Sequence, residues 1–205
     1  MGSTVNTDQP AYIVDGTLTD GEAWVPLQTN IVTGAAVGNI TMTSSTGVNN
    51  WSQYEDLVTI SYVQSSYGSG NSDTYRCRIN SDSTADIYAG QNAYHYGSTM
   101  GVSQWDDPEI FLGVLNTVTN NSGNDFGTAI NYFYDINAGK NTSVQSQFCG
   151  TNNVNNNFDG QVVATYLKTD QVTSLLFYFG TASIDVGSRI DLFGVRKILL
   201  GLNQL

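Results

Sequence analysis

The sequence is poor in charge and above all in basic residues. Only 12% of its 205 residues are charged, and 7 Lys and Arg stand against 18 Asp and Glu. This charged fraction is about half that of an average soluble protein. The formal net charge of −11 would repel a nucleic-acid backbone or an anionic membrane surface. We therefore expect neither a nucleic-acid partner nor a membrane partner.

The sequence also lacks the features of exported and membrane-spanning chains. Residues 1–10 contain no basic stretch followed by an apolar one, so no signal peptide is predicted. No apolar run approaches the roughly 20 residues that a membrane span requires. We expect a protein that is made in the cytoplasm of its host.

Candidate catalytic residues are scarce. The single histidine, His95, lies between two tyrosines in a segment that ends at Gly97. No Gly-x-Ser-x-Gly stretch supplies the strained turn that carries a serine nucleophile in many hydrolases. A histidine in a surface loop explains His95 more simply than a catalytic base, so we expect no enzymatic activity.

Metal sites and disulfides are also not predicted. Asp106, Asp107 and Glu109 offer the oxygen ligands that calcium prefers, but a solvated acidic turn explains them as well. The two cysteines, Cys77 and Cys149, form no C-x-x-C pair. Two buried free thiols are the preferred interpretation over a disulfide, and no cofactor is expected.

Short apolar or alternating stretches, separated by turn residues, make up most of the chain. They favour an all-β sandwich or barrel with little or no helix. No period of 20–50 residues repeats, which excludes solenoids and propellers. The predicted strands are 12–14, 23–27, 37–43, 57–64, 74–80, 86–89, 110–115, 130–136, 144–149, 162–167, 172–179 and 189–195.

Several of these stretches predict more than a strand. In 74–80 the residues Tyr75, Cys77 and Ile79 are expected to point inward, and this strand is expected to form a hairpin with 57–64. The stretch 172–179 is apolar on both faces, as in a strand that is covered on both sides. Pro26 argues for an edge strand, and Asn50 is suited to cap one helical turn at Trp51.

Three segments are predicted along the chain. Residues 1–10 form a polar N-terminal arm, and residues 11–195 form a single β-sandwich domain. Residues 196–205 form an apolar tail that docks on its own subunit or on a neighbouring one.

The order of several stretches resembles a family of tailed-bacteriophage virion proteins, found as head decoration, fibre or tail-associated modules. The resemblance implies a jelly-roll-like antiparallel β-sandwich, often a homotrimer, with no catalytic residues to carry over. The stretches that carry it are Asp56-Leu-Val-Thr-Ile60, Arg78-Ile-Asn-Ser-Asp82, Tyr88, Ile136 with Lys140, residues 172–179, and Gly187-Ser-Arg-Ile-Asp-Leu-Phe-Gly-Val195.

Subunit assembly is the function that we expect from these observations. The chain would be a bacteriophage virion structural protein, a head decoration or cement subunit, that contacts copies of itself and the major capsid protein or a tail component. Apolar surface beyond the needs of one sandwich, with two basic residues beside it, supplies the interface candidates. They are Phe177, Phe179, Arg196, Lys197, Ile198, Leu199, Leu200 and Leu202.

The alternative is an adhesion module, such as a tail fibre or a carbohydrate-binding module that contacts the host surface. Aromatic side chains beside hydrogen-bonding groups, in loops at the end of a rigid sandwich, would form a glycan platform. The candidates are Tyr94, Tyr96, Trp105 and Asp106, with Tyr88 near them. Core packing or subunit contact explains the same aromatic residues.

Overall fold

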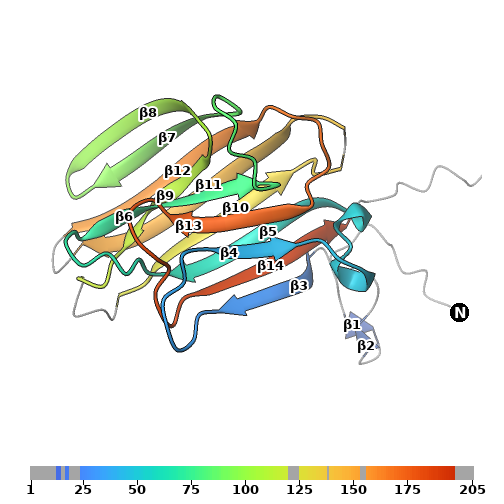
Figure 1. Ribbon diagram of the computed structural model, residues 1–205, viewed down its shortest axis with the longest axis horizontal. Coiled ribbons are helices and arrows are strands. Elements are labelled where there is room, and N and C mark those ends of the chain that lie inside the picture. Colours follow the sequence, from blue (N-terminus) through green and yellow to red (C-terminus); the bar gives the residue numbers. More distant parts are fainter. Residues whose placement is uncertain are drawn as a thin grey trace, which may run out of the picture.

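The structure is a computed structural model that describes residues 13–14, 17–18, 24–119, 125–137, 139–152 and 156–196. Its elements are almost all strands, and every strand pair is antiparallel (Figure 1). The strands are β1 (Ile13–Val14), β2 (Thr17–Leu18), β3 (Trp24–Ile31), β4 (Ile40–Thr43), β5 (Tyr54–Val63), β6 (Ser72–Ile79), β7 (Tyr88–Tyr96), β8 (Thr99–Asp107), β9 (Ile110–Asn116), β10 (Gly127–Tyr134), β11 (Thr142–Asn152), β12 (Asn156–Tyr166), β13 (Ser174–Phe179) and β14 (Arg189–Arg196).

Two sheets pack face to face and confirm the predicted all-β sandwich. The large sheet has the strand order β3-β14-β5-β10-β11-β12-β7-β8, and the small sheet has the order β4-β13-β6-β9. The first four strands of the large sheet and the four of the small sheet follow the chain as the eight strands of a jelly roll do. The predicted jelly-roll-like topology is therefore present.

Two hairpins are inserted into this jelly roll and widen the large sheet. The β7–β8 hairpin lies between β6 and β9 in the chain, and the β11–β12 hairpin lies between β10 and β13. Together they add the strands β11-β12-β7-β8 beside β10. We call β3-β14-β5-β10 the jelly-roll half of the large sheet and β11-β12-β7-β8 the added half.

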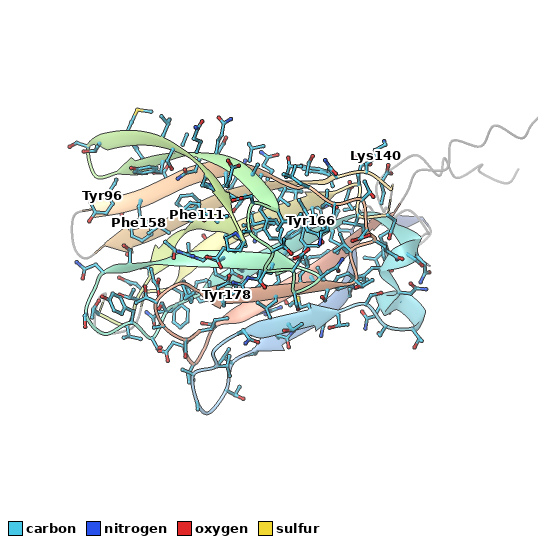
Figure 2. All side chains as sticks on the ribbon, turned by 45° about the horizontal axis from the view of Figure 1, so that its top comes forward. Tyr96, Phe111, Lys140, Phe158, Tyr166 and Tyr178 are labelled. Carbon is cyan, nitrogen blue, oxygen red and sulfur yellow. The ribbon has the colours of Figure 1, made fainter. Side chains whose placement is uncertain are left out.

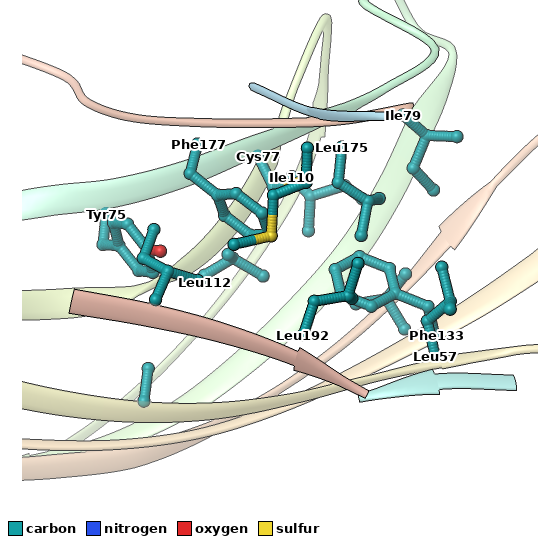
Figure 3. Close-up of a cluster of buried hydrophobic side chains, with 14 of the residues drawn as sticks. Leu57, Tyr75, Cys77, Ile79, Ile110, Leu112, Phe133, Leu175, Phe177 and Leu192 are labelled. Atoms are coloured by element: carbon teal, nitrogen blue, oxygen red, sulfur yellow. The ribbon is translucent and has the colours of Figure 1, made fainter. Parts of the chain in front are cut away.

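The core lies between the two sheets. Tyr75, Cys77 and Ile79 on β6 point into it as predicted and are fully buried. They face residues such as Leu57 and Phe133 of the large sheet (Figure 3). Alternation along each strand places every second side chain in this layer, where removal of apolar area from water stabilises the fold.

The predicted hairpin between 57–64 and 74–80 is wrong. β5 pairs with β10 and β14 in the large sheet, whereas β6 pairs with β9 and β13 in the small one. The Gly- and Ser-rich stretch between them carries the chain from one sheet to the other. The two strands then meet through their side chains, with 3.0 Å between the hydroxyl oxygens of Ser61 and Tyr75.

The predicted role of Phe177 and Phe179 at a subunit interface is contradicted by their burial. Both lie on the inner face of β13 and are 0% and 4% exposed, because they pack against Tyr75 inside the chain's own core. Within the described residues no second layer covers the outer face of β13, and Leu176 and Tyr178 there are half-buried. The expectation of a strand covered on both sides is therefore wrong as well.

Other local predictions have mixed outcomes. Pro26 lies in β3, an edge strand, and Asn50 caps the short 3-10 helix Trp51–Gln53 by accepting a hydrogen bond from the Ser52 amide, as predicted. The helix Gly47–Asn49 precedes it.

Both cysteines are free, but only Cys77 is buried, because Cys149 lies on the outer face of β11. No helix in the described part of the chain is long and apolar enough to span a membrane.

The predicted arm at residues 1–10 lies outside the described residues. The same is true of the tail candidates Lys197, Ile198, Leu199, Leu200 and Leu202, and of the side chain of Arg196, whose backbone ends β14.

Candidate functional site

Aromatic rings lie on glycines along the inner face of the added half. Each ring belongs to the residue that pairs with the glycine on the neighbouring strand, and a Cβ on the glycine would collide with the ring. A glycine leaves the backbone uncovered, so a large cross-strand ring can lie down on it. The pairs are Phe148 on Gly160, Phe158 on Gly150, Tyr94 on Gly101 and Trp105 on Gly90.

The β7–β8 hairpin extends beyond the small sheet, so part of this aromatic face is open. β9 packs over β11 and β12 and reaches β7. Phe148 and Phe158 are buried beneath it, but Tyr94 and Tyr96 are 39% and 41% exposed. Tyr96 stacks on Phe158 at the free end of the hairpin, with 6.5 Å between ring centroids (Figure 2). We call Tyr94, Tyr96 and Trp105 the aromatic shelf.

Polar groups accompany the shelf. Asn92 and Ser103 lie between Trp105 and Tyr94 on the same face, and the Ser103 hydroxyl donates to the Asn92 side-chain oxygen. A hollow of about 130 Å³ opens here between the hairpin and the edge of the small sheet. It is lined by Arg76, Asn92, Ser103, Trp105, Asp107, Glu109 and Phe111.

Ion pairs between one carboxylate and two guanidinium groups stabilise one side of this hollow. Glu109, whose side chain is 11% exposed, forms ion pairs with Arg76 and with Arg78, the latter at 3.1 Å. Tyr178 on β13 donates its hydroxyl to the same carboxylate, and the Arg78 guanidinium lies over its ring at 5.2 Å. Burial raises the pKa of Tyr178 although Arg78 and Arg76 lower it, so the phenol keeps its proton. This cluster joins the end of the hairpin to β6 and β13.

Three of the predicted glycan-binding residues come together, and one does not. Tyr94, Tyr96 and Trp105 share one face of a regular hairpin, where the sequence predicted loops. Asp106 is exposed on the opposite face of β8, because side chains alternate along a strand. Tyr88 is fully buried, and its hydroxyl accepts from the Ile79 amide at 2.9 Å, so it is a core residue.

The sequence contained a signal for this arrangement. The hairpin turns at Gly97 and Ser98, and Gly97 has a φ of 57°, which glycine adopts readily. Antiparallel pairing about that turn aligns Gly90 with Trp105 and Gly101 with Tyr94. Asp107, for which the sequence suggested a calcium ligand or a solvated acidic turn, is thereby placed beside the shelf.

The candidate catalytic and metal-binding residues lie apart from one another. His95 is half-exposed on the outer face of β7, and its Nδ1 lies 3.8 Å from Asp159 Oδ1. Cys149 lies one strand further, about 10 Å from His95 for strands about 4.8 Å apart, so the two make no nucleophile–base contact. Among the described residues no cluster of His, Cys, Asp and Glu is suited to a metal ion.

A second group of aromatic residues lies on the outer face of the jelly-roll half. The ring centroid of Trp24 lies 5.8 Å from that of Phe193 and 6.1 Å from that of Tyr132, which it meets edge-on. Tyr132 in turn stacks on Tyr134. Val58 points to this outer face and is nevertheless fully buried, because Phe193 and Tyr132 flank it on the neighbouring strands. We call Trp24, Phe193, Tyr132 and Tyr134 the outer aromatic cluster.

The Arg78-to-Asp82 stretch, on which the resemblance partly rests, has a structural role. Asn80 has a φ of 55°, and its side-chain oxygen accepts from the amides of Thr173 and Ser174, which fixes the start of β13. Asp82 pairs with Lys168 after β12 and accepts from the Thr84 side chain, and these contacts lower the pKa of Asp82 well below its usual range. The stretch therefore joins β6 to the segment between β12 and β13.

No protein-family model, no curated protein and no solved structure matches the chain.

Proposed function

We propose that this protein is a non-enzymatic structural subunit of a bacteriophage virion, a head decoration or cement protein that assembles with copies of itself. The outer aromatic cluster is the observation that carries the proposal. It is an apolar surface on a sheet face that the small sheet leaves open, and aromatic side chains are enriched in protein interfaces. The virion as the setting comes from the sequence resemblance.

The charged groups around this surface are compensated within the chain, so a second copy can occupy it. Two copies of a chain with a net charge of −11 repel each other, so association requires a contact with little uncompensated charge. Beside the cluster, Arg189 and Asp191 pair with each other at 2.8 Å. At its other end, Asp56 accepts from the Asp135 amide at 2.9 Å, and burial raises the pKa of Asp56.

Sedimentation velocity of the full chain tests the assembly step. We expect an oligomer that dissociates at least tenfold more readily in Tyr132→Glu, which adds a charge to the cluster. Gln147→Glu is the matched control, because Gln147 is exposed on the outer face of the same sheet but in the added half. A monomeric wild-type chain, or equal effects of the two variants, would refute self-association through the cluster.

Electron microscopy of virions labelled with an antibody against the chain tests the setting. Label over the head supports a decoration protein, and label confined to the tail transfers the proposal to a fibre or tail component. Absence of label from virions that carry the gene would exclude the virion role.

A further inference from the structure

We propose that the aromatic shelf, with the hollow beside Trp105, binds a neutral polysaccharide. Sugar rings would stack on Tyr94, Tyr96 and Trp105, and hydroxyl groups would bind in the hollow. This activity goes beyond assembly through the outer aromatic cluster and does not depend on it.

The position of the aromatic rings suits a sugar ligand. A pyranose ring presents an apolar face of C–H groups and a rim of hydroxyl groups, so its best aromatic partner is a ring that exposes its flat face. The Tyr94 and Trp105 rings occupy the space above Gly101 and Gly90 where a side chain would otherwise lie, and Tyr94 is 39% exposed. The exposed area of Tyr94 and Tyr96 is the apolar surface on which a sugar ring would stack.

The distribution of polar groups also suits a sugar ligand. Binding sites for small polar molecules combine apolar and aromatic walls with a few fixed hydrogen-bonding groups. The hollow supplies an amide, a hydroxyl, a guanidinium and two carboxylates beside the Trp105 indole. Its volume of about 130 Å³ corresponds to about four water molecules, so it is suited to the hydroxyl groups at one edge of a sugar unit and not to the whole ring.

The spacing of the rings indicates a polymer. Gly90 and Tyr94 are four residues apart on β7, which is about 13 Å along the strand. Asn92 and its partner Ser103 lie between the two rings. This separation exceeds one sugar ring, so Trp105 and Tyr94 would contact different units of the same chain.

Charge indicates that the polymer is neutral. Arg76, which lines the hollow, and the neighbouring Arg78 are both paired with Glu109, and Asp107 adds a negative charge. A polyuronate or another anionic polymer would meet this carboxylate and the net charge of −11.

Affinity electrophoresis of the full chain in gels that contain a β-glucan, an α-mannan, a galactan or alginate tests the proposal. We expect at least one neutral polysaccharide to retard the protein and alginate to have no effect. Tyr94→Ala and Tyr96→Ala, which alter exposed side chains, should weaken the retardation at least tenfold. Trp105→Ala should do the same if circular dichroism shows that it folds.

Tyr62→Ala is the matched control, because Tyr62 is 47% exposed and lies on the outer face of the jelly-roll half. It should leave the retardation unchanged. The proposal is overturned if no neutral polysaccharide retards the protein, if alginate retards it more strongly, or if Tyr62→Ala has the same effect as Tyr94→Ala.

Discussion

Both halves of the large sheet carry exposed aromatic rings, on the outer face of the jelly-roll half and on the uncovered part of the inner face of the added half, but the rings are held differently. In the jelly-roll half, Trp24 packs edge-on against Tyr132, with an angle of 74° between the ring planes. In the added half, Trp105 and Tyr94 lie on glycines of the neighbouring strand. The rings of the first group contact each other, whereas those of the second group contact backbone.

The difference shows that the cross-strand partner determines what an aromatic side chain offers to a ligand. Phe193, Val58 and Tyr132 occupy paired positions on adjacent strands, so their side chains fill the space above the sheet and form a compact apolar surface. Opposite a glycine that space is empty, and the ring of the cross-strand residue fills it. The first arrangement is suited to another protein surface and the second to a flat ligand.

The largest expected effect concerns the ion pairs that attach the added half to the small sheet. Glu109→Gln should lower the free energy of unfolding by about 2–3 kcal/mol, because two arginines lose their counter-ion. The figure is below that of a fully buried pair, since Arg76 and Arg78 are 34% and 30% exposed. Urea unfolding at neutral pH measures it.

Asp191→Asn is the control for this prediction. Asp191 pairs with Arg189, which is 54% exposed, so the loss should not exceed about 0.5 kcal/mol. Equal losses in the two variants would show that Glu109 does not anchor the hairpin.

The next largest loss of stability is expected when a glycine beneath an aromatic ring in the added half is replaced by alanine. In Gly160→Ala the new Cβ would lie 2.6 Å from both the Ala93 carbonyl oxygen and the Phe148 ring. Overpacking of this kind costs about 1–3 kcal/mol. The same change in Gly68→Ala meets no atom within 4 Å and should be neutral or slightly stabilising by urea unfolding. A neutral Gly160→Ala would contradict the described packing.

The outer aromatic cluster should contribute less to stability than the rings that lie on glycines in the added half. Trp24→Ala removes a side chain that is 38% exposed and uncovers part of the apolar surface around Val58. We expect a loss of about 1 kcal/mol in thermal or urea unfolding. Met100→Ala, at an 80% exposed position on β8, should change stability by less than about 0.5 kcal/mol. If Trp24→Ala lowered the free energy of unfolding more than Gly160→Ala does, the outer aromatic cluster would be the more important of the two for stability.

The smallest effect is expected where the stretch after β6 meets the segment that follows β12. Lys168 and Thr84 lower the pKa of Asp82, so this carboxylate stabilises the fold at a pH above the ordinary aspartate value of about 3.9, and that contribution is lost as the pH falls. Asp82→Asn should cost about 1 kcal/mol or less at pH 7, because Lys168 is 38% exposed.

Urea unfolding at pH 7 and at decreasing pH measures this effect. The difference between wild type and Asp82→Asn should shrink as the pH falls below about 4. A difference that does not depend on pH would show that the side chain acts through packing and not through its charge.

The sequence by itself determined the fold class and the inner face of most strands. Alternation in β6 identified Tyr75, Cys77 and Ile79 as core residues, because the two faces of a strand are set by the chain's own geometry. The same local reasoning located the Asn50 cap and the edge position of Pro26.

Only the tertiary structure decided which strands are neighbours. It placed β5 and β6 in different sheets, buried Phe177 and Phe179 against Tyr75, and set Trp105 on Gly90. Alternation shows which way a side chain points but not what lies opposite, since pairing depends on contacts between residues that are far apart in the chain. The shelf, the hollow and the outer aromatic cluster all arise from such pairings.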